Sequence, residues 1–293
     1  MDEKALLDIG TFSVFFNYVN TFPLLSRFIN AAIVLLGAFM LNGLVVRHSV
    51  LYKNTALTFL FYLLFACLVP EFSYFNTFTV LNFLSILLFR QIIVVYDNRD
   101  ANYEVFKAAL IIGIGGMFHI SFFFTVLFLL FGITRFIPLS PRLLIVILIA
   151  AIFPYACLAS ILYAYPSFHS FVIFNNYRAG ISHVGTLHWI VFIPFAIMIF
   201  FSAFSWLNNA QRNTVKVRRT IQVILVYVLF AVVLSALYWG ATWNSIELLQ
   251  MPSAIVLAYF FTSSKSMKLR NSIFATLLIL ILFTQFATHL YLW

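Results

Sequence analysis

The feature that most constrains this chain is a near-continuous series of apolar stretches from Phe28 to Trp293, separated by short loops whose positive charges alternate. Basic loops stay on the cytoplasmic side of a membrane, so this alternation is typical of a chain that crosses the membrane many times. We assign to the cytoplasmic side the basic loops 47–53, 97–104, 135–141, 207–220 and 264–271. The sequence therefore predicts a polytopic membrane protein.

The composition excludes a water-soluble domain. Hydrophobic residues make up 64% of the chain and charged residues 9%, whereas a typical soluble domain is about 25% charged. The net charge of +9 sits in short loops beside the apolar stretches and not on one face. It favours contact with anionic lipid head groups over nucleic acid. We expect membrane lipids as partners, no nucleic acid, and no cofactor.

The apolar stretches predict an all-α transmembrane bundle of about nine to ten spans, because most of them are close to the roughly 20 residues that cross a bilayer core. The predicted spans are 28–46, 54–69, 76–96, a pair of short helices within 105–134, 142–165, 188–206, 221–239, 252–263 and 272–291. This count places both termini on the outer side. We expect two parts, residues 1–27 and a single transmembrane domain over 28–293.

Residues 9–26 and 105–134 depart from the simple span pattern. In the first, Phe and Val recur at helical spacing opposite Ser and Asn, and Pro23 ends the pattern, which predicts an amphipathic helix in the membrane interface. The second is too long for one span, carries GIGG near its centre and is basic at both flanks. It predicts two short helices that meet near His119, with the turn buried in protein or facing a water-filled cavity.

Polar residues that could bind a ligand gather on the predicted outer side. Arg178 is the candidate anchor for an anionic group such as a lipid-linked phosphate, since its guanidinium pairs two oxygens at once. Candidate catalytic bases are Glu71, His119 and His183, and the other candidate ligand-binding residues are His169, Tyr177, His188 and Glu247. The alternative is that these residues only favour the interface, where one end is apolar and the other wet. No metal site is expected, because His183 and His188 are five apart and lack the i, i+4 spacing of paired ligands.

Three stretches carry a resemblance: LVPEFSYFNTFTVLNFLSILLFRQIIVVYDNRD at 68–100, VFKAALIIGIGGMFHISFFFTVLFLLFGITRFI at 105–137, and MPSAIVLAYFFTSSKSMKLRNSIFATLLILILFTQ at 251–285. Together they resemble an uncharacterised family of polytopic inner-membrane proteins of Bacteroides- and Flavobacterium-like bacteria. The resemblance implies a bacterial inner-membrane location and no established activity. The paired short helices are also similar, at the level of the fold, to multi-span glycosyltransferases that use polyprenyl-phosphate sugars. Those enzymes place a catalytic acid after a first span, whereas here the only acids near the start are Asp2, Glu3 and Asp8.

Three classes of function stay open. The first is a cell-envelope biogenesis protein that binds or processes a lipid-linked glycan at the outer leaflet, which leaves open whether it is a glycosyltransferase-like enzyme. The second is a non-catalytic membrane scaffold or partner subunit, and the third is a lipid or polysaccharide transporter. A closed outer cavity around Arg178 would favour the first, scattered polar groups the second, and a polar path through the bundle the third.

Overall fold

The computed structural model describes residues 12–51, 55–68, 73–97, 101–165, 186–209, 215–238, 243–264 and 266–289. Within these ranges the regular structure is helical, and no strand occurs. The elements are α1 (Ser13–Asn20), α2 (Pro23–Arg47), α3 (Leu57–Ala66), α4 (Thr77–Asp97), α5 (Ala101–Phe118), η3 (Ile120–Phe124), α6 (Thr125–Thr134), α7 (Pro141–Ala164), α8 (Thr186–Asn209), α9 (Val215–Tyr238), η6 (Trp243–Leu249), α10 (Gln250–Ser263) and α11 (Met267–His289). The prediction of an all-helical fold is confirmed.

The helices have the length and composition of membrane spans. Six segments are long and apolar enough to cross a bilayer: Pro23–Arg47, Thr77–Val95, Pro141–Ala164, Val217–Ser235, Ile246–Ser263 and Met267–Phe286. Shorter apolar helices lie at Leu57–Ala66, Phe122–Thr134 and Ile193–Trp206. The chain is a multi-pass membrane protein, as the series of apolar stretches predicted.

The chain forms two compact units. The first comprises Met1–Ile33 and Tyr74–Arg178, and the second comprises Val34–Ser73 and Ala179–Trp293. Helix α2 therefore gives its first turns to unit 1 and the rest to unit 2. The boundary predicted at residue 27 is not tested by this division and stays a prediction.

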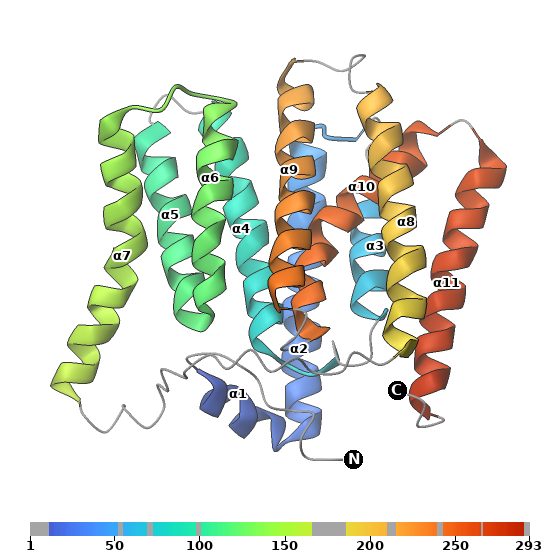
Figure 1. Ribbon diagram of the computed structural model, residues 1–293, viewed down its shortest axis with the longest axis horizontal. Helices are drawn as coiled ribbons and strands as arrows, with labels where there is room; N and C mark the ends of the chain where they lie inside the picture. The colour runs from blue at the N-terminus through green and yellow to red at the C-terminus, as the bar shows by residue number, and fades with distance from the viewer. Residues whose placement is uncertain are drawn as a thin grey trace. The chain divides into compact units, whose positions relative to one another are not determined.

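In unit 1 the short amphipathic helix α1 lies across the ends of longer helices (Figure 1). Its apolar face contributes Phe16 and Val19 to a small core with Phe75, and the Phe16 ring lies 4.9 Å from that of Phe75. The opposite face exposes Tyr18, as an interfacial helix should. The first span starts earlier than predicted, because Pro23 opens α2. Proline is favoured at the first helical position, where its missing N–H costs nothing.

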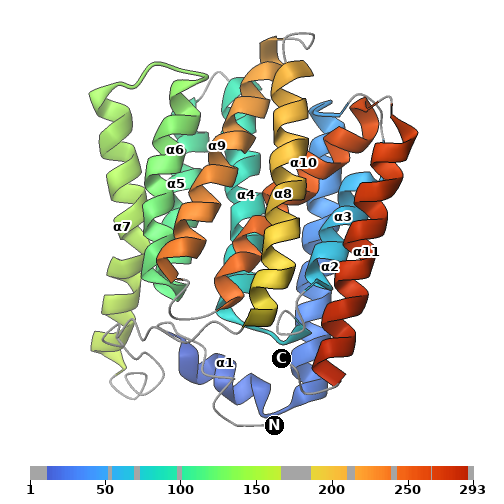
Figure 2. The same cartoon turned by 45° about the vertical axis from the view of Figure 1, so that its right-hand side comes forward.

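The break near His119 is present. Helix α5 ends at Phe118, the 3₁₀ helix η3 follows, and α6 runs back beside α5 (Figures 1 and 2). The prediction of two helices that meet near His119 is thereby confirmed. On its other side α5 packs closely on α7, where the backbone carbonyl of Ala151 and the ring of Pro154 lie against Gly113.

In unit 2 a buried helix is wrapped by its neighbours. Every residue of α10 from Gln250 to Phe260 is buried, and α10 packs on α3, α8 and α9. A helix that is apolar on all faces is stable either in lipid or inside a protein, and α10 lies inside the protein. Aromatic contacts hold α10 in place. The ring centroid of Trp206 in α8 lies 4.7 Å from the ring centroid of Tyr259 in α10. Helix α11 packs on α8 and stays largely exposed.

Candidate functional site

Glu247 is the most deeply buried charged residue in the described part of the chain. It is 1% exposed and lies in η6, at the start of the candidate span Ile246–Ser263. The other buried acid there, Glu104, is bonded to Lys107 at 3.2 Å. The sequence predicted Glu247 on the outer side, which stays a prediction, and the structure buries the residue in unit 2 at the start of the span. An acid within a span is costly to keep and usually marks a functional site.

Other buried polar side chains of unit 2 come from α3, α9 and α10. One turn after Glu247, Gln250 donates a hydrogen bond from Nε2 to the main-chain oxygen of Tyr62 in α3, at 2.9 Å. The Tyr62 hydroxyl interacts electrostatically with the side chains of Glu247 and of Tyr227 in α9. All four side chains are buried. We call Glu247, Gln250, Tyr62 and Tyr227 the Glu247 cluster.

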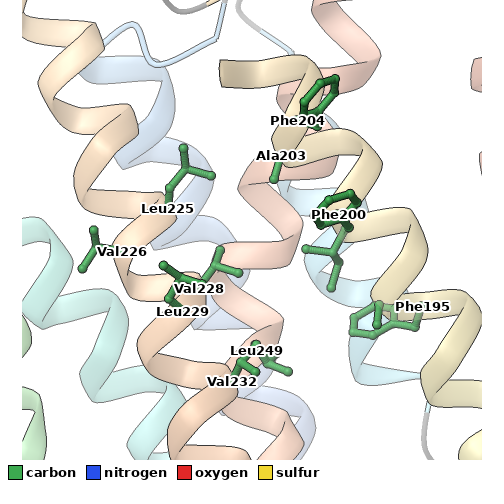
Figure 3. A pocket seen from close by; sticks show the side chains of 12 residues that line it. Phe195, Phe200, Ala203, Phe204, Leu225, Val226, Val228, Leu229, Val232 and Leu249 are labelled. Carbon is green, nitrogen blue, oxygen red and sulfur yellow. The ribbon is translucent and has the colours of Figure 1, made fainter. Parts of the chain in front are cut away.

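An apolar groove of about 490 Å³ lies between α8 and α9 of the same unit (Figure 3). Leu249, two residues after Glu247, lies at one end of it near Val232. Every lining side chain is apolar: Phe195, Ala196, Ile199, Phe200, Ala203, Phe204, Leu225, Val226, Val228, Leu229, Val232 and Leu249. The groove can therefore hold a hydrocarbon chain but not a polar group.

Unit 1 contains a separate buried polar network. Ser26 of α2 donates from Oγ to Asn20 Oδ1 at 2.5 Å and accepts from the backbone N–H of Phe75 at 3.0 Å. Thr79 of α4 donates from Oγ1 to Asn30 Oδ1 at 2.9 Å. Amides and hydroxyls in spans commonly join helices in this way. These bonds fix α1, α2 and the start of α4 together.

His119 lies at the break between α5 and η3 in unit 1. Its side chain is 3% exposed, and its ring centroid is 5.5 Å from that of Phe78. Its backbone N–H donates to the Gly115 carbonyl, and its own carbonyl accepts from Phe122 N–H. His119 is buried, but Ile120 and Phe124 of the same turn are exposed, so the turn is only partly buried in protein. A role for His119 as a base stays a prediction.

Most of the other predicted site residues lie outside the described ranges. These are Glu71, His169, Tyr177, Arg178 and His183. His188 falls in α8, but its side chain is also outside the description. The predicted outer cavity that would join these residues to Arg178 therefore stays a prediction.

Sequence reasoning missed Tyr62, Gln250 and the groove. A signal was present for Gln250, which is three residues after Glu247 and so shares its face of a helix. Nothing local pointed to Tyr62, which is 188 positions from its partner. Among the described residues, no group of three or more His, Cys, Asp or Glu could hold a metal ion.

The comparisons with known proteins identify a family. No curated protein and no solved structure matches the chain. A family of unknown function (DUF6427) matches residues 6–291, which is almost the whole chain. The match covers α1, every candidate span and both units. This polytopic membrane protein therefore belongs to the family of unknown function DUF6427.

Proposed function

We propose that the protein acts in bacterial cell-envelope biogenesis by binding a lipid-linked glycan at the outer leaflet of the inner membrane. The observation that supports this most is the Glu247 cluster. A carboxyl, an amide and two phenols are the groups that hydrogen-bond sugar hydroxyls and phosphates. These side chains are buried inside unit 2, where polar groups are costly unless they are hydrogen-bonded.

The residues predicted on the outer side are proposed in further roles. Arg178 is proposed as the anchor for the phosphate of the lipid, and Glu71, His119 or His183 as a base if the bound glycan is also processed. The proposed orientation has both termini in the periplasm, which sets the 166–187 loop on the outer side. A membrane protein partner is also proposed.

The experiment compares Glu247→Gln and Glu247→Ala in a strain that lacks the gene and shows an envelope defect. We expect both variants to lose rescue, with Gln retaining more because it keeps the size and one acceptor. The control is Glu104→Gln, the other buried acid, whose partner Lys107 lies 3.2 Å away in unit 1. Each variant must be extracted and monodisperse. Full rescue by Glu247→Ala would contradict the proposal.

A second variant tests the anion anchor. Arg178→Lys should lose much of the rescue and Arg178→Ala nearly all of it, since lysine is a point charge that cannot pair two oxygens. The control is Arg142→Ala, an exposed basic residue at the start of α7. If both Arg178 variants rescue fully, the outer anion site is wrong and a scaffold role is favoured.

The burial of Glu247 also favours a second candidate, a proton-coupled lipid or polysaccharide transporter. Carboxyls within spans commonly carry protons in such proteins. Proteoliposomes with an internal pH dye distinguish the two functions. A transporter should show substrate-dependent proton movement that Glu247→Gln abolishes, whereas a glycan-binding protein should show none with either chain.

A further inference from the structure

We propose that the groove between α8 and α9 binds an acyl chain of an anionic phospholipid, whose phosphate lies at Arg218. This site differs from the glycan site proposed above. It concerns an ordinary bilayer lipid and the end of the groove that is remote from Glu247. The proposal is independent of which side of the membrane that end faces.

The shape of the groove on α8 comes from alternating side-chain sizes. Ala196 and Ala203 are seven residues apart and so lie on one face of the helix, where their small side chains leave space. Phe200 and Phe204 are exposed beside them and form one wall (Figure 3). The space is open to the membrane along the exposed face of these rings. A volume of about 490 Å³ is within the range of ligand pockets, about 300 to 1,000 Å³.

The facing stripe of α9 changes from apolar to charged along the helix. Leu225, Leu229 and Val232 line the groove at helical spacing. The same stripe continues toward the N-terminus through Gln222 to Arg218, both of which are exposed. Arg218 is two turns from Leu225, about 10 Å along the axis. Hydrocarbon, amide and guanidinium thus follow in the order of an acyl chain, an ester and a phosphate.

The charge at this end selects for an anionic head group. Arg219 is adjacent to Arg218, and the sequence contains no acidic residue between Glu104 and Glu247. The local field from α8, α9 and their loop is therefore positive throughout. A basic residue beside the membrane surface favours an anionic lipid by about fivefold. Basic pockets between membrane helices are known to recognise lipid head groups in this way.

The test uses the full chain in vesicles of phosphatidylglycerol and phosphatidylcholine. A trace of one lipid carries a photoreactive diazirine in its acyl chain, and labelled peptides are measured by mass spectrometry. We expect the phosphatidylglycerol probe to label peptides of α8 and α9 about fivefold more than the phosphatidylcholine probe. Labelling of residues 152–161 in the second half of α7, which contain exposed apolar side chains and no basic residue, should be equal for the two probes.

Substitutions at two positions separate the contribution of the acyl chain from that of the head group. Ala203→Trp fills the groove and should reduce its labelling to the level of α7, with Ala203→Leu as a smaller substitution if the first is not monodisperse. Arg218→Gln should keep the labelling and remove the difference between the two probes. The matched controls on α7, Leu148→Trp and Arg142→Gln, should change neither.

Three results would overturn the proposal. The first is equal labelling of the groove by both probes in the unaltered chain. The second is unchanged labelling of Ala203→Trp. The third is a disulfide crosslink between two copies of the Phe204→Cys variant, which would mean that a protein helix and not a lipid covers the groove.

Discussion

Gln250 donates a hydrogen bond from its side-chain amide to the main-chain carbonyl of Tyr62 at 2.9 Å, and so joins α10 to α3. Gln250 is 2% exposed. Without such a bond, the amide would be buried among apolar side chains with one donor fewer satisfied, which is costly. The contact therefore stabilises unit 2. It also fixes the side chain of Gln250, which lies one turn from Glu247.

We expect Gln250→Leu to lower the free energy of unfolding by about 1 kcal/mol, the usual value of a hydrogen bond between membrane helices. Gln250→Glu should be more damaging, because it adds a second carboxyl three residues from Glu247. Thermal unfolding of the purified protein in detergent measures both. The control is Thr276→Val in α11, whose hydroxyl is exposed and bonds only within its own helix in the described contacts. Equal midpoints for all three variants would contradict this role of Gln250.

A second prediction concerns two glycines in different helices. A Cβ atom on Gly113 of α5 would collide with the backbone carbonyl of Ala151 and lie 2.9 Å from Pro154 Cγ. A Cβ atom on Gly43 of α2 would meet nothing within 4 Å. Because the backbone of α7 cannot give way as a side chain could, Gly113→Ala should destabilise by about 1 to 3 kcal/mol.

Gly43→Ala is the matched control for Gly113→Ala. Both glycines are inside helices, so the gain from helix propensity, about 1 kcal/mol, is the same for each. Gly43→Ala should therefore be neutral or stabilising in a thermal unfolding experiment. A Gly113→Ala variant as stable as Gly43→Ala would show that α5 and α7 are further apart than the structure has them.

The order and type of the helices could be predicted from the sequence, because span length and basic loops are imposed by the membrane and not by tertiary contacts. The break near His119 was also predictable from length and glycine content. The start of α2 at Pro23 was not, since proline both ends and begins helices. Pro23 was assigned to the end of the amphipathic pattern, but it is the first residue of α2.

The candidate site was less predictable. Glu247 was recognised as a polar residue of interest, but its burial depends on η6 folding back against α9 and on α3, far away in the chain. The groove depends on which face of α8 meets α9, which no local pattern encodes. The residues assigned to the outer cavity, such as Arg178, lie outside the described ranges, so that part of the sequence interpretation stays a prediction.

A third prediction tests the network of unit 1. Thr79 Oγ1 and Asn30 Oδ1 are 2.9 Å apart and both side chains are buried. In a double-mutant cycle, Asn30→Ala and Thr79→Val should each destabilise, and their coupling energy should be about 1 kcal/mol. The measurement is unfolding in detergent of the two single variants and the double variant. A coupling energy near zero would mean that the bond adds nothing to the joining of α2 and α4.

The last prediction concerns orientation, and helix α7 provides a matched pair of positions. Leu139 precedes α7 and Tyr163 is near its other end, and both are exposed. Because Arg135 and Arg142 flank the first position, we expect it on the cytoplasmic side and Tyr163 on the outer side. Cys67 and Cys157 are exposed and must first be replaced by alanine. In intact spheroplasts, an impermeant maleimide should then label Tyr163→Cys and spare Leu139→Cys, and permeabilisation should make the two equal. Strong labelling of Leu139→Cys before permeabilisation, with Tyr163→Cys protected, would invert the topology and would place the proposed glycan site on the cytoplasmic face.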